Sequence, residues 1–311
     1  MIRILTGRAL LAFFLIGFIL SASLIAIDRW SILLLILALF FLVIGLLQVF
    51  LFEKRKRPKE TSVSLRFEHL FLVLGVVLTY AIVTVLGVDA VVASALVGLS
   101  AAIFVKDHAL AAYCGSFAGM TASALIEPVM MVLVVSILIV VYELTKGILT
   151  GFGGKSGTLA LVSVFSTVIL LNRDFLVVTL PQYDPILVIV VAIFGALITY
   201  VLQHRYEQNS VLASAAPSLL FALVMLPLSS LGQFYSAVFY AASFIGMSER
   251  KRLRNVYTVA FAGVVLGVLF QLMSPLFNGS GGKLGTLALV SVLVVFGFES
   301  LSSRIITRLK G

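Results

Sequence analysis

Long apolar segments without charge are the feature that most constrains this chain. Residues 31–52 contain no charged side chain, and neither do residues 69–88. About 18 or more consecutive apolar residues form a helix long enough to span the hydrocarbon core of a bilayer. Of the 311 residues, 61% are hydrophobic and 11% are charged, whereas a soluble domain has about 25% charged residues. The sequence therefore excludes a soluble protein and predicts an all-α, polytopic membrane protein.

Short polar loops divide the chain into about twelve predicted transmembrane helices. The apolar segments lie at 9–27, 30–52, 68–87, 90–105, 109–121, 126–145, 157–171, 184–203, 211–228, 234–247, 256–273 and 285–298. We interpret residues 1–52 as two peripheral N-terminal helices and residues 53–67 as a basic cytoplasmic linker. Residues 1–26 also resemble a signal peptide, but we expect them to be retained as the first helix.

The basic residues indicate an orientation in the membrane. The formal net charge is +9, and the Lys and Arg residues form short clusters between apolar segments, so we expect no nucleic-acid partner. With twelve crossings and a cytoplasmic N-terminus, every cytoplasmic loop carries Lys or Arg, as the positive-inside rule requires. We therefore predict a multi-pass protein of the plasma (inner) membrane with both termini in the cytoplasm. The sequence does not decide whether the chain forms a homo-oligomer.

Two motifs recur in the same order. GGKSGTLALVSV at 153–164 is repeated as GGKLGTLALVSV at 281–292, and YCGSFAGMT at 113–121 is matched by YAASFIGMS at 240–248. The first repeat is predicted at 68–172, followed by an outer loop at 173–183, the second repeat at 184–299 and a basic cytoplasmic tail at 300–311. Because each repeat holds five segments, an odd number, the second copy is expected to be inverted, as in many transporters. Urea transporters share this architecture, but the analogy concerns the architecture alone and implies nothing about function.

The repeated Gly-Lys loops are the first candidate site. The segments that follow them hold about 13–14 apolar residues, roughly 20 Å of helix and less than a bilayer core, which predicts loops that dip into the membrane. Their glycines allow close approach of the backbone, and helix N-termini favour an anion or a carbonyl oxygen. The alternative is a pair of tight surface turns whose lysines reach the headgroups. The candidate solute-binding residues are Gly153, Gly154, Lys155, Gly157, Thr158, Gly281, Gly282, Lys283, Gly285 and Thr286.

The second motif supplies four more candidates. Phe117 and Phe244 are predicted to form a constriction, with Ser116 and Ser243 as polar contacts for the solute. The alternative is that small residues three positions apart simply allow close helix packing. Glu127 is a candidate for ion or proton coupling because acids within membrane segments are often functional, and helix capping is its alternative role.

Enzyme motifs are absent from the sequence. A phosphate-binding loop would need a glycine at position 149, which is Leu149. There is no zinc-protease or hydrolase motif, and Cys114 is the single cysteine, so we expect no catalytic residues, no metal and no cofactor. The leading hypothesis is a transporter or channel that moves a small polar or anionic solute between two inverted repeats. The alternative is a non-transporting membrane subunit or scaffold, with lipid handling as one role for it.

Overall fold

The computed structural model describes residues 2–23, 28–52 and 67–310, and within them the chain is all-α. The predicted linker at 53–67 lies outside the described residues except for Phe67, and residues 1 and 24–26 of the signal-like segment also lie outside them. The α-helices are α1 (Ile2–Ser23), α2 (Arg29–Leu47), α3 (Phe67–Leu86), α4 (Ala90–Phe104), α5 (Ala109–Gly119), α6 (Met131–Leu144), α7 (Lys155–Leu170), α8 (Pro185–His204), α9 (Ser210–Met225), α10 (Ser229–Gly246), α11 (Val256–Met273) and α12 (Lys283–Lys310).

Seven described segments are long and apolar enough to cross a membrane, so the chain is a membrane-embedded all-α protein. They are Leu5–Ser23, Arg29–Leu51, Phe67–Leu86, Pro185–His204, Ser210–Gly246, Val256–Met273 and Lys283–Ile305. The shorter apolar helices are Ala90–Phe104, Pro128–Leu144 and Lys155–Leu170. The segment Ser210–Gly246 contains both α9 and α10, which are separated by the short 3-10 helix Leu226–Leu228, and α10 begins at Ser229 with a φ of +50°.

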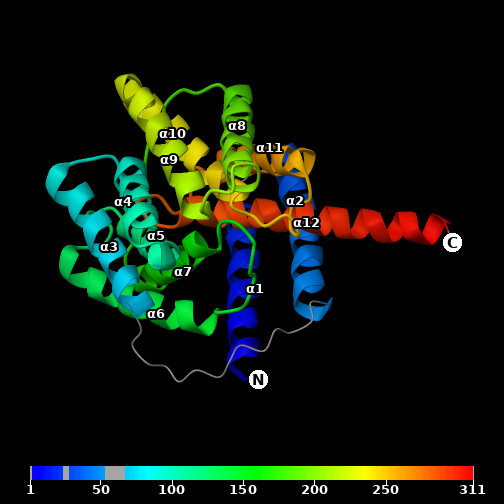
Figure 1. Cartoon of the computed structure of the whole chain (residues 1–311), viewed down its shortest axis with the longest axis horizontal. Helices are drawn as coiled ribbons and strands as arrows, with labels where there is room; N and C mark the ends of the chain where they lie inside the picture. Colours follow the sequence, from blue (N-terminus) through cyan, green and yellow to red (C-terminus); the bar gives the residue numbers. More distant parts are fainter. Residues whose placement is uncertain (1, 24–27, 53–66, 311) are drawn as a thin grey trace.

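The helix that follows the second Gly-Lys loop is longer than predicted. The sequence suggested an apolar segment ending at residue 298 and a separate tail at 300–311, but α12 continues as one helix to Lys310. Residues 298–310 contain no proline or glycine, so nothing breaks the helical hydrogen bonds there. In Figure 1, the C-terminal part of α12 (red) extends beyond the other helices. The prediction of a short helix after each loop is therefore wrong for the second copy.

Several helices begin with a capping side chain. The Asp89 carboxylate accepts a hydrogen bond from the amide of Val91 at 2.9 Å, and the Asn209 side chain accepts one from the amide of Val211 at 2.8 Å. These caps satisfy amide groups that have no partner within the helix. Because Asp89 precedes α4 and Asn209 precedes α9, the second helix of each predicted repeat starts in the same way.

The core is built from helix pairs that meet at glycines. α3 packs along α5, and α8 packs along α10. A Cβ atom on Gly115 of α5 would lie 1.9 Å from the carbonyl oxygen of Leu72, and one on Gly195 of α8 would lie 2.7 Å from that of Phe239. Small residues allow such close backbone approach between membrane helices. In Figure 1, α3–α7 are grouped together and α8–α11 lie above them, with α12 crossing between.

The groups α3–α7 and α8–α11 differ in how closely one pair of helices packs. α8 and α11 pack closely, and a Cβ on Gly263 or Gly267 of α11 would lie within 3 Å of the α8 backbone. α3 and α6 make few contacts, and the matching positions of α6 are Val135 and Ile139. Bulky side chains in place of the two glycines keep α6 away from α3.

Candidate functional site

The two Gly-Lys loops meet each other at their glycines. A Cβ on Gly157 would lie 2.6 Å from the Cα of Gly285, and a Cβ on Gly285 would lie 2.6 Å from the Cα of Gly157. A Cβ on Gly154 would lie 2.2 Å from the oxygen of Gly285, and one on Gly282 would lie 2.3 Å from the oxygen of Gly157. When position i contacts j′ and i′ contacts j, the two surfaces are related by a two-fold axis. The loops are thus two halves of one locally symmetric contact.

Each Gly-Lys loop also donates a hydrogen bond to a copy of the second motif: the first loop to the second copy, and the second loop to the first copy. The amide of Gly153 donates to the hydroxyl of Ser248 at 3.0 Å, and the amide of Gly281 donates to the hydroxyl of Thr121 at 3.1 Å. Ser248 and Thr121 are the last residues of the two copies of the second motif, YAASFIGMS and YCGSFAGMT. The first loop therefore binds α10 and the second loop binds α5, so the two halves are interlocked.

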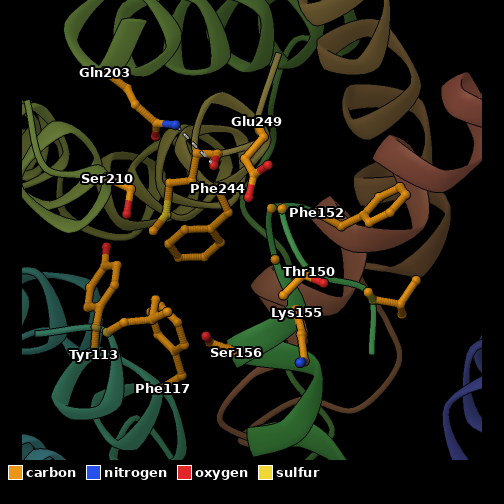
Figure 2. A pocket seen from close by; sticks show the side chains of 16 residues that line it. Tyr113, Phe117, Thr150, Phe152, Lys155, Ser156, Gln203, Ser210, Phe244 and Glu249 are labelled. Carbon is orange, nitrogen blue, oxygen red and sulfur yellow. Dashed lines mark hydrogen bonds between the residues drawn. The ribbon is translucent and has the colours of Figure 1, made fainter. Parts of the chain in front are cut away.

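The lysine ammonium groups bind the ends of the preceding helices. Lys155 Nζ donates to the carbonyl oxygen of Thr145 at 2.8 Å, at the end of α6. Lys283 Nζ donates to the carbonyl oxygen of Ser274 at 3.0 Å, at the end of α11, and to the side-chain oxygen of Asn278 at 3.0 Å. A cation is favourable at a helix C-terminus. Figure 2 shows the ammonium of Lys155 directed away from the ring of Phe244.

The two threonines of the loops are buried and bonded within their own helices. The hydroxyl of Thr158 donates to the oxygen of Gly154 at 3.3 Å, and that of Thr286 donates to the oxygen of Gly282 at 3.1 Å. These hydroxyls stabilise the first turns of α7 and α12. Reaching a solute would require them to break those bonds.

The serines of the second motif belong to two buried hydrogen-bond networks. Ser94 Oγ lies 2.8 Å from Ser116 Oγ and 2.8 Å from Tyr240 Oη. The matching network comprises Ser214 with Ser243 at 2.7 Å and with Tyr113 at 3.0 Å. Each network joins the two groups of helices, because the tyrosine comes from the other copy. All of these side chains are buried, so the network leaves no polar atom of Ser116 or Ser243 for solvent.

Sequence analysis missed Ser94 and Ser214, although a signal for them exists. The stretches VVASA at 91–95 and VLASA at 211–215 lie at matching places, two residues after the capping Asp89 and Asn209. The signal is short and consists of common residues. It can be interpreted once the structure shows that each serine bonds to a tyrosine from the other copy of the second motif.

Four aromatic rings fill the centre between the two networks. The rings of Phe117 and Phe244 have their centroids 4.9 Å apart, and Tyr113 lies 6.0 Å from Phe244 while Tyr240 lies 6.1 Å from Phe117. Tyr113 and Tyr240 are fully buried, and the two phenylalanines are at most 4% exposed. Rings at such distances pack favourably. The predicted constriction at Phe117 and Phe244 therefore corresponds to a closed aromatic cluster, which we define as Tyr113, Phe117, Tyr240 and Phe244.

A cavity of about 310 Å³ ends on one side of the aromatic cluster. Its floor comprises Tyr113, Phe117 and Phe244, and its wall is the loop from Leu149 to Ser156 (Figure 2). The polar side chains that line it are Thr150, Lys155, Ser156, Gln203, Ser210 and Glu249. Of the predicted residues, Phe117, Gly153, Gly154, Lys155 and Phe244 line this cavity. Among the described residues, those of the second loop are not part of its lining.

The side facing the second loop has different chemistry at the matching positions. The helix contacts pair Val76 with Ala196 and Tyr80 with Tyr200. On this pairing four of the six polar lining residues have apolar counterparts, which are Leu284 for Ser156, Val83 for Gln203, Ala90 for Ser210 and Ala122 for Glu249. The other two have polar counterparts, which are Lys283 for Lys155 and Asn278 for Thr150. The side chain of Leu176, from the segment after α7, also covers this side, and a Cβ on Gly279 would lie 2.6 Å from it. The polar cavity is thus built on one side of a symmetric centre.

Glu127 lies apart from the cavity, near the protein surface. Its carboxylate pairs with Arg173 at 2.8 Å, and 58% of its side chain is exposed. The matching Asn255 caps α11 through its side chain, but Glu127 makes no side-chain cap. A different acid is buried: Glu143 lies 3.1 Å from His69 and 3.6 Å from Lys146. Glu143 and Lys146 are three positions apart, a spacing at which an ion pair can form along a helix.

No group of three potential metal ligands occurs among the residues that the structure describes. Comparison with protein-family models, with curated proteins and with solved structures finds no match to this chain. The functional argument therefore depends on the geometry of the loops, the aromatic cluster and the cavity.

Proposed function

We propose that this protein is a membrane transporter or channel for a small polar or anionic solute. The observation that carries the proposal is the cavity of about 310 Å³ that ends on the aromatic cluster and has polar side chains within a largely apolar lining. Binding sites for small molecules are concave, with volumes from about 300 Å³ and a few polar groups that fix the ligand. In this proposal the aromatic cluster is the closed gate of the pathway.

The local symmetry supports an inverted repeat. The matched contacts at Gly157 and Gly285 are two-fold, and in transporters with inverted repeats the axis lies in the membrane plane with the solute site at the repeat interface. In this arrangement α3–α7 form the first repeat and α8–α12 the second, and twelve helices cross the plasma (inner) membrane. Lys146, Arg205 and Arg250 lie within three residues in the sequence of the lining residues Leu149, Gln203 and Glu249, so the positive-inside rule favours a cavity open to the cytoplasm.

The lining favours a solute that makes several hydrogen bonds. Ser156, Ser210 and Thr150 supply hydroxyl groups, and the loop supplies backbone groups. The formal charges in the lining are those of Lys155 and Glu249, and the Glu249 carboxylate pairs with Lys251 at 2.5 Å. The Lys155 ammonium binds the end of α6, so an anionic solute would interact with it at longer range than a direct contact.

Solute flux into proteoliposomes tests the proposal, with neutral amides, polyols and small inorganic anions as solutes. We expect flux of at least one of them above that of lipid alone. Ser156→Leu should lower this flux by about fivefold or more, because it removes a hydroxyl and fills the cavity. The matched control, Leu284→Ser, changes the other side and should alter flux less. Flux equal to lipid alone for every solute would refute transport.

A non-transporting membrane subunit or scaffold is the second candidate, and one observation favours it. The centre of the molecule is closed, because Gly157 and Gly285 are in backbone contact and the aromatic cluster is buried. A scaffold needs no pathway through this centre. It predicts that Phe117→Ala and Phe244→Ala reduce stability without opening any flux, whereas in the transport proposal removal of these rings alters the flux.

A further inference from the structure

One side chain of the cavity lining carries a buried polar atom without a partner. Gln203, near the end of α8, lines the cavity, and its Oε1 atom is buried with no hydrogen-bond partner among the described residues. Its Nε2 atom donates to the carbonyl oxygen of Met247 at 3.4 Å. Because a carbonyl oxygen can only accept, the amide keeps its nitrogen toward Met247 and leaves its oxygen available. A buried acceptor without a partner costs free energy, and a ligand that donates to it removes that cost.

The charged groups of the lining are engaged elsewhere. Lys155 is the one cationic side chain of the described lining, and its Nζ donates to the carbonyl oxygen of Thr145 at 2.8 Å (Figure 2). The Glu249 carboxylate lies against the loop, since a Cβ on Gly151 would lie 2.7 Å from its Oε1 atom, and it pairs with Lys251 at 2.5 Å. An anion in the cavity would therefore meet a carboxylate in the wall, while the ammonium of the lining is bonded to a helix end.

The remaining lining groups are neutral and suit an uncharged solute. Hydroxyl groups can donate or accept, and aromatic rings pack on the apolar part of a ligand. Burial of an ionised group against apolar surface costs far more than burial of a neutral polar group. The hydroxyls of the lining belong to Thr150, Ser156 and Ser210, and the rings of its floor to Tyr113, Phe117 and Phe244.

We propose that the solute is a small neutral molecule with N–H or O–H donors, an amide or a polyol, and that Gln203 Oε1 accepts a hydrogen bond from it. This inference rests on the proposed transport function and narrows its solute to the uncharged class. Gln203 is then a residue that determines specificity. Its counterpart on the side of the second loop is Val83, which has no acceptor, so the proposed recognition belongs to the cavity alone.

Binding to the purified full-length chain in a neutral detergent tests the proposal. Acetamide, glycerol and acetate are each titrated, and binding is measured by saturation-transfer NMR. Acetamide and acetate have nearly the same shape but differ in charge and in N–H donors. We expect acetamide or glycerol to bind about tenfold or more tightly than acetate.

A variant of Gln203 tests its role in this selectivity. Gln203→Met keeps the length of the side chain and removes the acceptor, so it should weaken binding of the neutral solute by about fivefold and leave acetate unchanged. The matched control is Gln271→Met, because Gln271 donates to the carbonyl oxygens of Pro185 and Gly267 and lies outside the cavity lining. A loss of stability alone would not change the ratio of acetamide to acetate binding. Helical content and elution volume equal to wild type confirm that each variant is folded.

The outcomes separate the solute class from transport itself. Binding of acetamide assigns the donor to N–H groups, binding of glycerol assigns it to O–H groups, and binding of both supports the wider class. The proposal is overturned if acetate binds as tightly as the neutral solutes or if none of the three binds. It is also overturned if Gln203→Met binds like wild type, as it would if water satisfied the amide oxygen, or if Gln271→Met loses as much. Flux of anions without neutral solutes would refute the class and leave transport standing, whereas binding of a neutral solute without any flux would refute transport alone.

Discussion

Replacing Gly157 with alanine should separate the two Gly-Lys loops. The new Cβ would lie 2.6 Å from the Cα of Gly285 and 3.1 Å from its nitrogen. Carbon atoms in contact normally lie about 3.5–4.0 Å apart, so the helices must move apart by about 1 Å. The atoms in the way belong to the backbone, so no side-chain rotation can relieve the overlap.

The size of the effect follows from two opposing contributions. Overpacking of this kind lowers the free energy of unfolding by about 1–3 kcal/mol. Alanine in place of glycine in a helix raises it by up to about 1 kcal/mol. The matched control is Gly17 of α1, where a new Cβ meets nothing within 4 Å. Gly17→Ala should therefore be neutral or slightly stabilising, and Gly157→Ala should be destabilising by about 2 kcal/mol.

Thermal unfolding in detergent, followed by the monomer peak in size-exclusion chromatography, measures the difference. We expect an apparent melting temperature several degrees lower for Gly157→Ala than for Gly17→Ala. The double variant Gly157→Ala/Gly285→Ala should lose less than the sum of the single effects, since one separation relieves both overlaps. Equal melting temperatures for Gly157→Ala and Gly17→Ala would show that the loops do not touch as described.

Two further stability predictions use matched pairs of residues. Ser94→Ala and Ser214→Ala should destabilise by similar amounts, about 1–3 kcal/mol each, because each leaves a buried tyrosine hydroxyl without its partner. Ser136→Ala, at an exposed serine bonded within its own helix, should change stability by less than about 0.5 kcal/mol, and a loss as large as at Ser94 would contradict the buried networks. Glu143→Ala should cost about 1–3 kcal/mol, since it removes the carboxylate that lies within hydrogen-bond distance of the buried His69 ring. Glu127→Ala breaks an exposed pair worth about 1 kcal/mol or less. Chemical or thermal unfolding of the five variants measures both differences, and equal losses for the two acids would refute the contrast in burial.

Helix positions could be predicted from the sequence because charge-free apolar segments have few alternatives to membrane helices. The all-α prediction is confirmed, and each predicted segment corresponds to a helix. The end of α12 could not be located in this way. Apolarity stops near residue 298, but a helix continues through polar residues as long as no breaker intervenes.

The loop pair shows what a repeat can and cannot predict. The repeated glycines indicated close backbone approach, and the structure shows that approach between Gly157 and Gly285. The direction of the lysines was not predictable, because the acceptor of Lys155 is a carbonyl oxygen at the end of α6. Which carbonyl groups a helix leaves open depends on where the folded helix ends.

The sequence also could not predict that the cavity lies on one side of the aromatic cluster. Two nearly identical loops suggested two equivalent half-sites, but the polar lining depends on single differences such as Ser156 against Leu284. It depends also on Leu176, which comes from the segment after α7 and lies against Gly279 of the second loop. Such single-residue differences can be interpreted once the contacts show which positions around the first loop correspond to which positions around the second.

Labelling of engineered cysteines from each side of the membrane tests the central claim most directly, namely that the two Gly-Lys loops face opposite membrane surfaces. Replacing Cys114, the single native cysteine, with alanine provides a cysteine-free background. Thr150→Cys and Pro275→Cys place one exposed thiol in each loop region. Inside-out and right-side-out vesicles are then treated with a membrane-impermeant maleimide. We predict that Thr150→Cys reacts from the cytoplasmic side alone and Pro275→Cys from the opposite side alone. Labelling of both positions from the same side would contradict the inverted repeat.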